Sequence, residues 1–387
     1  MVIMMKIINL IKHHEEYRSS TISLIPSENV MSETARRALS SDLVHRYIDS
    51  DFYGGTKYMD EIVNITRELA KRLFNVDHAF VEPLSGTMCV IATILAYTKS
   101  GDKIAALREE DGGFPFRYND FERKLIPLPF DEKEETIDVE RAKDVIAKEK
   151  PKLIILGASI IPFPHSVKEI SEFAEEYGIP VVYDGSHVLG LITGGKFQDP
   201  IREGALVLMG STHKTFPGPQ GGLILTNDDD AARRLAHYLD RPPLLIDNPH
   251  VHRIAALGIT LEEMLEFGKE YAKQIVRNSK ILGEILYANG LKIMYPEKGF
   301  TESHQVLMKC APEEGRRMRD ILEKAGIITD SWIRFGTQEI TRLGAKEDDV
   351  KEIGLMIINA LEGQITNVRN QVIEMRKKLC KVHYSFD

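Results

Sequence analysis

Short apolar runs alternate with amphipathic segments through the middle of the chain, most regularly from residue 138 onward. The spacing predicts helices at residues 139–148 and 167–177, and strands at 152–156, 181–184 and 205–209. The strand segments are rich in Val, Ile and Leu and lack polar alternation, which is typical of strands buried on both faces of a parallel sheet. This pattern predicts an α/β domain whose mostly parallel sheet is covered by helices, with a ligand at the carboxyl ends of the strands.

The remaining segments extend the pattern in both directions. On the N-terminal side we expect an apolar helix ending at Tyr97, helices at 3–18, 33–43 and 59–74, and strands at 79–81 and 103–106. A strand at 223–226 closes the large domain, and Pro242 and Pro243 interrupt the pattern. A long helix at 261–289 leads to strands at 291–295, 305–309 and 332–335 and helices at 315–325, 346–361 and 366–380. We therefore predict an N-terminal helical arm (1–30), a large domain (31–255), and a bridging helix with a smaller α+β C-terminal domain (256–387).

Composition narrows the class of protein. The 387 residues are 43% apolar and 28% charged, as in an ordinary soluble protein of two domains. A net charge of −8 argues against a general nucleic-acid surface. No segment approaches the ~18 apolar residues of a membrane span, and the N-terminus lacks the uninterrupted apolar core of a signal peptide. The three cysteines have no paired spacing, so we expect no disulfide framework, no metal site and a reducing cytoplasm.

Two polar residues follow the central strands. Asp184 ends a β-branched run, and Lys214 lies among small hydroxyl residues shortly after the next strand, before a glycine-rich tail at 217–222. Pyridoxal phosphate (PLP) requires a lysine for its Schiff base and an acid beside its pyridinium nitrogen. Taken singly, a strand-end aspartate that caps a helix and a surface lysine would be ordinary. Together with His187 they predict a PLP site.

A phosphate site is the next candidate. Ser85, Gly86 and Thr87 lie between a short strand and an apolar helix. Backbone N–H groups at a helix N-terminus, with hydroxyls beside them, bind phosphate well. A plain helix cap is the alternative for such a tripeptide. Its place ahead of Asp184 and Lys214 favours the PLP phosphate.

These strings resemble a known family. The stretch 211–222 (STHKTFPGPQGG) is similar to the PLP-lysine motif of serine hydroxymethyltransferases, particularly their archaeal branch, and 183–191 (YDGSHVLGL) is similar to their aspartate motif. The likeness runs from residues 24–29 (LIPSEN) through 333–337 (IRFGT) to the closing 383–387 (HYSFD). The resemblance implies a fold-type-I PLP-dependent transferase with a reduced pterin of the tetrahydrofolate or tetrahydromethanopterin type as co-substrate. It also implies a homodimer with shared active sites.

The resemblance also implies roles for individual residues. Lys214 would form the Schiff base, Asp184 would hold the ring nitrogen, and Arg334 and Ser27 would bind the substrate carboxylate. Tyr47, Asp49 and Tyr53 would reach the neighbouring subunit's site, where Asp49 and Tyr53 would act on the substrate. His187 would lie near the ring as a catalytic or cofactor-binding residue. The rest of the cofactor site would be formed by Ser85, Gly86, Thr87, Phe114, Ser159, Ser211, His213 and Gly222.

The chain departs from the family pattern at four places. The loop at 47–52 is shortened, and Asp49 stands where the family has a glutamate that handles the serine hydroxyl. Phe114 replaces the histidine that stacks on the PLP ring, and an insertion associated with pterin binding is reduced to residues 329–332. Gln220 stands where other branches have arginine, as in archaeal members. Three of the four departures fall on the pterin side.

Several functions therefore remain open. The overall resemblance favours transfer of a hydroxymethyl group between serine and glycine with a reduced pterin, in one-carbon and amino-acid metabolism. The shortened loops favour a pterin-independent aldolase acting on threonine or allo-threonine. A weakly active PLP-binding paralogue and a general aminotransferase share the same PLP residues. In each case we expect a small amino acid as ligand, and neither nucleic acid nor membrane as partner.

Overall fold

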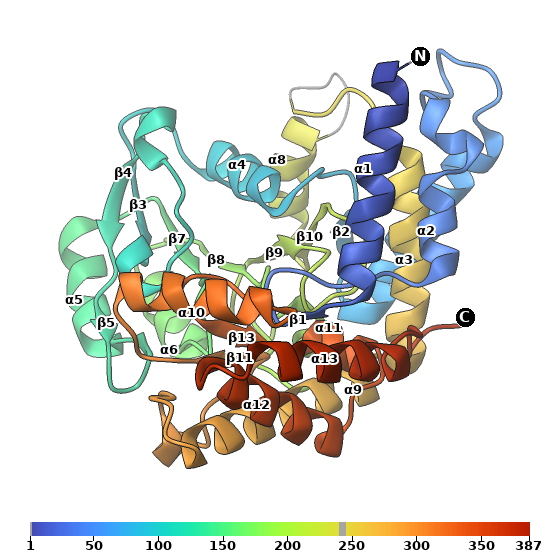
Figure 1. Cartoon of the computed structure of the whole chain (residues 1–387). Helices are drawn as coiled ribbons and strands as arrows, with labels where there is room; N and C mark the ends of the chain where they lie inside the picture. The colour runs from blue at the N-terminus through green and yellow to red at the C-terminus, as the bar shows by residue number, and fades with distance from the viewer. Residues whose placement is uncertain (1, 240–244) are drawn as a thin grey trace. The chain divides into compact units, whose positions relative to one another are not determined.

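The structure is a computed structural model that describes residues 2–239 and 245–387, with residues 2–4 described by their backbone alone. Pro242 and Pro243, which the sequence marks as a break, lie outside the described residues. The chain forms two compact units (Figure 1). The larger contains residues 29–273 and 384–387, and the smaller contains residues 1–28 and 274–383. The predicted boundaries of an arm and two domains stay a prediction.

A seven-stranded sheet forms the centre of the larger unit. Its order is β2 (His78–Phe80), β10 (Gly222–Thr226), β9 (Val207–Ser211), β8 (Val181–Asp184), β7 (Leu153–Leu156), β3 (Lys103–Ala106) and β4 (Lys124–Pro127). Only β10 runs against its neighbours, and the pairs from β9 to β4 are all parallel. The predicted mostly parallel sheet is confirmed.

Helices cover both faces of this sheet. In Figure 1, α4 (Gly86–Tyr97) and α8 (Asp229–Leu239) lie on one face and α6 (Val167–Glu175) lies on the other. The core under α4 and α8 contains Ile94, Val182, Met209 and Leu235, which are fully buried. Each such side chain contributes about 1.5–3 kcal/mol to stability through removal of apolar surface from water. The unit also contains α2 (Glu33–Leu39), α3 (Lys57–Phe74), α5 (Val139–Glu149), α7 (Leu189–Thr193) and the hairpin of β5 (Phe130–Asp131) and β6 (Thr136–Ile137).

The smaller unit is built from an N-terminal segment and most of the C-terminal part of the chain. Helix α1 (Val2–Ser19) leads to β1 (Ile22–Ser23), which pairs in parallel with β12 (Ile327–Ile328). A second pair consists of β11 (Gln305–Leu307) and β13 (Arg334–Gly336). The helices are α10 (Pro312–Lys324), α11 (Gln338–Arg342), α12 (Glu347–Leu361) and α13 (Ile365–Lys378). Helix α9 (Val251–Ala288) is continuous from one unit into the other.

Most predicted elements are present, but α9 begins at Val251 instead of 261, and the helix predicted at 33–43 ends at Leu39. The short elements α7, α11, β1, β5 and β6 were not predicted. The strand predicted at 291–295 is wrong: the segment makes one isolated bridge, Ile293 to Met308, and Tyr295 takes a left-handed conformation before Pro296. The sequence analysis missed β4, an edge strand that ends in proline, and α8. Within the described residues, no helix is both long and apolar enough to cross a lipid bilayer.

Gly157, directly after β7, provides a test of the sheet edge. Its φ is +98°, and a Cβ there would lie 2.1 Å from the carbonyl oxygen of Asp184. We expect Gly157→Ala to lower the free energy of unfolding by about 3 kcal/mol or more, because the backbone and the contact are both strained. Urea denaturation measures this loss.

Gly178→Ala is the matched control. Gly178 also has a positive φ, +63°, but a Cβ there would meet no atom within 4 Å. This substitution is expected to cost only about 1 kcal/mol. Equal losses in the two variants would contradict the close approach of the β7 end to Asp184.

Candidate active site

The strand register places Asp184 beside the segment that leads to Lys214. In the parallel pair of β8 and β9, Asp184 is opposite Met209, two residues before the end of β9. The Asp184 carboxylate accepts a hydrogen bond from the backbone N–H of Ser186 at 2.9 Å. The hydroxyl of Ser186 in turn accepts from the backbone N–H of Ser211 at 2.9 Å. The ends of both strands are therefore connected through one serine side chain.

The loop that carries Lys214 is fixed by its own backbone and by Asn29. The N–H of Gly218 donates to the carbonyl of Thr212 at 2.8 Å, and the Thr212 hydroxyl donates to the Pro219 carbonyl at 2.6 Å. The Asn29 amide donates to the Lys214 carbonyl at 2.6 Å and to the Tyr271 hydroxyl at 2.8 Å. Lys214 itself is half-buried. Its main chain is thus held by the loop and by Asn29.

Helix α4 begins next to these strand ends. The Ser85 side chain caps the helix by accepting a hydrogen bond from the Met88 N–H at 3.1 Å. A Cβ at Gly86 would lie 2.4 Å from the Ser211 hydroxyl and 3.0 Å from that of Ser186. A Cβ at Gly222 would lie 2.5 Å from the Ser85 carbonyl. Glycine at these positions allows the helix N-terminus, β9 and β10 to approach closely.

Of the two predicted histidines, His213 directly precedes Lys214 in the loop, and His187 contacts the loop at Thr215. His187 is buried, and its carbonyl accepts a hydrogen bond from the Thr215 hydroxyl at 2.7 Å. His213 is half-buried, and its Nδ1 atom is buried without a hydrogen-bond partner among the described residues. Burial, with a smaller contribution from the Lys214 charge, lowers the pKa of His213 to about 4. His213 is therefore a neutral imidazole at physiological pH.

Phe114 and Ser159 belong to loops that contact each other. The Gly112 carbonyl accepts hydrogen bonds from the backbone N–H groups of Ser159 at 2.8 Å and Ile160 at 3.0 Å. A Cβ at Gly113 would lie 2.3 Å from the Leu107 carbonyl, so the chain bends tightly before Phe114. The half-buried Phe114 ring lies 6.3 Å from that of Phe116. The structure thus joins the loops that follow β3 and β7.

The segment with Tyr47, Asp49 and Tyr53 forms a compact turn with exposed aromatic rings. The Asp49 carbonyl accepts from the N–H of Tyr53 at 2.6 Å and of Phe52 at 3.0 Å. The Tyr53 ring lies 5.8 Å from that of Tyr47 and 4.9 Å from that of Phe52. Asp49 lines a cavity of about 220 Å³ on the larger unit, together with Asp60, Arg67, Glu82 and Asp247.

The smaller unit holds Ser27 and Arg334. The Gly336 N–H donates to the Leu24 carbonyl at 2.7 Å, which joins the end of β13 to the chain that leads to Ser27. The Arg334 Nε atom donates to Asp330 at 2.7 Å, and the guanidinium lies 5.3 Å from the Trp332 ring centroid. Asp330 also accepts from the N–H groups of Trp332 and Arg334. The shortened segment before Arg334 is therefore closed by one aspartate.

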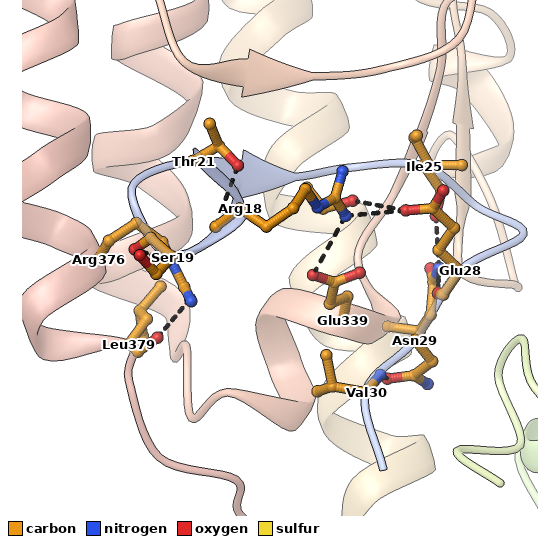
Figure 2. Close-up of polar contacts among 12 residues, drawn as sticks. Arg18, Ser19, Thr21, Ile25, Glu28, Asn29, Val30, Glu339, Arg376 and Leu379 are labelled. Atoms are coloured by element: carbon orange, nitrogen blue, oxygen red, sulfur yellow. Dashed lines mark hydrogen bonds and ion pairs between the residues drawn. The ribbon is translucent and has the colours of Figure 1, made fainter. Parts of the chain in front are cut away.

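The turn that contains Ser27 rests on a cluster of buried charges, shown in Figure 2. Arg18 donates to Glu28 at 2.9 Å and lies 3.9 Å from Glu339. The Gln338 amide donates to the carbonyls of Ile25 at 2.7 Å and Glu28 at 2.6 Å. Burial raises the pKa of Glu339 to about 7, although Arg18 opposes that shift. Glu339 is thus held in an environment that favours its neutral form.

The predicted site residues divide between the units. Ser27 and Arg334 belong to the smaller unit. The larger unit brings eight others together at its strand ends: Asp184, Lys214, Ser85, Gly86, Ser211, His187, His213 and Gly222. The sequence analysis gave no role to Asn29, Ser186 or Thr215, which hold the lysine loop. All three lie inside the family strings at 24–29, 183–191 and 211–222, but those strings do not show that each side chain bonds a backbone group distant in sequence. Among the described residues, no cluster of three or more His, Cys, Asp or Glu side chains is positioned to hold a metal ion.

The strand ends of the larger unit fit PLP. They combine a carboxylate, a lysine and a capped helix N-terminus, and His213 presents a buried nitrogen without a partner among the described residues. Glycine at 86 keeps the helix N-terminus against Ser211 without an intervening side chain. These are the acid, the amine and the phosphate-binding N–H groups that the cofactor requires.

Comparisons with known proteins give one consistent result. The family described as serine hydroxymethyltransferase matches residues 3–357. The serine hydroxymethyltransferase of Methanocaldococcus jannaschii is 43% identical over 97% of this chain and 94% of its own length. That of Pyrococcus furiosus is 41% identical over 99% and 96%. Among solved structures, L-threonine transaldolase from Pseudomonas fluorescens in its internal aldimine state has a TM-score of 0.91 at 26% identity, covering 100% of this chain and 94% of that one.

The raised pKa of Glu339 predicts a pH dependence of stability. The folded protein binds a proton at about pH 7, whereas the unfolded chain binds it near 4.5. Stability therefore rises as pH falls from 8 to 5, and the buried charge costs stability above pH 7. We expect Glu339→Gln to remove this trend, so that its free energy of unfolding relative to wild type changes by about 2 kcal/mol across that range.

Urea denaturation at a series of pH values checks this expectation. Glu28→Gln is the control, because Glu28 shares Arg18 but its side chain is nearly half exposed. The same loss of pH dependence in both variants would contradict the assignment to Glu339.

Proposed function

Because the chain belongs to the serine hydroxymethyltransferase family, we propose that it interconverts serine and glycine, with PLP as cofactor and a reduced pterin as one-carbon carrier. Its fold is that of the fold-type-I PLP-dependent enzymes, as the sequence predicted. The observation that carries the proposal is the meeting of Asp184, the Lys214 loop and the N-terminus of α4 at one sheet edge.

Within this proposal each strand-end residue has a defined role. Bound PLP supplies an electron sink that stabilises negative charge at the α-carbon of an amino acid. Lys214 attaches the cofactor through its amino group, and Asp184 keeps the proton on the ring nitrogen. The N-terminus of α4, with Ser85, Gly86 and Thr87, binds the phosphate. His187, His213, Ser211, Gly222, Ser159 and Phe114 complete the pocket around the ring.

The substrate carboxylate is assigned to Arg334, with Ser27 beside it. Arginine matches a carboxylate with two parallel hydrogen bonds. Asp330 holds the Nε side of the Arg334 guanidinium at 2.7 Å, which orients its planar group. The side chains of Asp49, Tyr47 and Tyr53 act at the β-hydroxyl of the substrate. The carbon that carries this hydroxyl loses or gains its bond to the α-carbon in the reaction.

A second function has specific support. The segment before Arg334 is short, closed by Asp330 and strained at Ile333, a buried β-branched residue with a φ of +53°. Together with the loop that contains Asp49, it lies in the regions that the resemblance associates with the pterin. The structural likeness to a threonine transaldolase agrees with this alternative. The alternative function proposed for this chain is a pterin-independent aldol cleavage of β-hydroxy amino acids such as threonine.

We further propose a homodimer with shared active sites. On the larger unit, Tyr47 and Phe52 are 50% and 78% exposed. On the smaller, α1 presents Ile7, Ile8, Leu10 and Ile11 to solvent. Groups of exposed apolar side chains of this kind mark association surfaces. A cytoplasmic location is supported by the three free thiols, Cys89, Cys310 and Cys380.

Absorbance spectroscopy tests the cofactor and the reaction. We expect purified protein with PLP to show a bound-cofactor band that glycine alters, and Lys214→Ala to lose the covalently bound form. Adding tetrahydrofolate or tetrahydromethanopterin should strongly increase the glycine-induced change. If glycine acts but neither pterin has an effect, and threonine is cleaved to acetaldehyde, the aldolase replaces hydroxymethyl transfer. A wild-type protein that binds no PLP would contradict both.

Light scattering after size exclusion tests the dimer. Wild-type protein is expected at twice the mass of one chain. Ile8→Asp combined with Ile11→Asp should weaken association by about tenfold or more, because burial of these side chains drives it. Lys12→Glu changes charge on the same helix without removing apolar surface and serves as the control. A monomeric wild type would refute the shared-site arrangement.

A further inference from the structure

Arg253, in the first turn of α9, lies buried in the larger unit behind the N-terminus of α4. Its Nη2 atom donates hydrogen bonds to the carbonyls of Val81 at 2.6 Å and Glu82 at 3.0 Å. These residues follow β2 and lead through Pro83 and Leu84 to Ser85, where α4 is capped. Arg253 therefore holds the main chain that enters the proposed phosphate site.

The same guanidinium packs against the glycine-rich segment beyond Lys214. A Cβ at Gly221 would lie 2.6 Å from the Arg253 Nη1 atom, so glycine at this position allows the guanidinium to approach the main chain closely. The Gly221 carbonyl accepts from the Thr212 N–H at 3.2 Å, and the Gly222 N–H donates to the Pro83 carbonyl at 2.8 Å. Arg253 thus lies between the chain that enters the phosphate site and the strand next to the lysine loop.

Burying the charged Arg253 guanidinium costs free energy, and the hydrogen-bonding capacity of this group is only partly used. Arg253 is 5% exposed, and its Nε and Nη1 atoms have no hydrogen-bond partner among the described residues. Burial lowers the pKa of Arg253 to about 10, which leaves it charged at neutral pH. A buried charge is normally offset by an opposite charge close by.

The nearest acid does not balance the cluster. Glu82 is 4% exposed and pairs with Arg67, whose Nη2 and Nε atoms lie 2.7 Å and 3.1 Å from one carboxylate oxygen. That carboxylate is thus already engaged by Arg67, and its attraction offsets only part of the cost of burying Arg253. Cys89, in the second turn of α4, senses this charge: burial and Asp184 raise the pKa of its thiol, and Arg253 opposes them. The Arg253 charge is therefore close enough to act on a side chain near the beginning of α4.

We propose that Arg253 is a positioning residue for the cofactor phosphate, which fixes the chain entering Ser85–Gly86–Thr87 and supplies positive charge that offsets the phosphate. This inference rests on the proposed PLP function. Phosphate is a dianion near neutral pH, and helix N–H groups offset only about half an elementary charge. The buried Arg253 guanidinium, close to the chain that enters the helix, provides compensation without occupying the pocket.

Binding of PLP and of pyridoxal, which lacks the phosphate, separates this role from a general one. Apo-protein is titrated with each compound, and the absorbance of bound cofactor gives the dissociation constants. We expect Arg253→Met to weaken PLP binding by about tenfold or more, as for loss of a buried charge contact. Binding of pyridoxal should change by less than about twofold, because it carries no charge for Arg253 to offset. The phosphorus NMR resonance of bound PLP should also shift in the variant.

Two further variants make the test specific. Arg253→Lys keeps the charge and should retain most of the preference for PLP over pyridoxal. Arg123→Met is the matched control, because Arg123 donates to the Thr98 carbonyl at 2.8 Å and to its hydroxyl at 2.9 Å, at the opposite end of α4. It should lower stability without changing the ratio of the two dissociation constants.

The outcomes distinguish a failure of the proposed PLP function from a failure of the role proposed for Arg253. A wild-type protein that binds neither compound contradicts the proposed function. A wild type that binds PLP, with Arg253→Met binding it equally well or losing both compounds equally, overturns the role of Arg253. If Arg253→Met does not fold, Glu82→Gln decides: removing that negative charge must strengthen PLP binding relative to pyridoxal, and an unchanged or lower preference overturns the inference.

Discussion

Asp184 and the lysine loop lie beside each other because β8 and β9 are adjacent parallel strands, and parallel strands end on the same edge of a sheet. That register allows one hydroxyl, on Ser186, to contact the backbone of Ser211. It also requires glycine at 157 and 86, where the neighbouring strand or serine leaves no space for a Cβ. A shift of the register by one residue would turn Asp184 to the opposite face and separate the two groups.

Several ionisable groups around the candidate site are buried, and their partners explain how each is tolerated. Glu82 and Arg67 form a close pair, and Glu339 is stabilised in its neutral form by burial beside Arg18. His213 is likewise neutral, since burial disfavours its protonation. Arg253 differs, because it remains charged with two nitrogens that have no hydrogen-bond partner among the described residues. A phosphate nearby would offset that charge.

The residues assigned to the cofactor and those assigned to the substrate lie on different kinds of structural element. The residues proposed to bind PLP lie at strand ends, at one helix N-terminus and in the loops that follow the strands, so a rigid sheet sets most of their positions. The residues assigned to the substrate side lie on short loops, one closed by Asp330 and one by the Asp49 carbonyl. Loops tolerate shortening better than strands do. Under the proposed function, these loops would decide between a pterin-dependent and a pterin-independent reaction.

The sequence by itself determined the α/β class, the central strands and the Asp184–Lys214 pair, because apolar periodicity and local motifs depend on neighbouring residues. It also indicated the family through strings such as 211–222 and 183–191. It did not reveal β4, whose edge position leaves it partly exposed, and it wrongly predicted a strand at 291–295. Only the tertiary structure decided that Asn29 holds the Lys214 carbonyl and that Arg253 holds Val81 and Glu82. Each contact joins a side chain to a backbone carbonyl more than 170 residues away, and a backbone carbonyl has no signature in the amino-acid sequence.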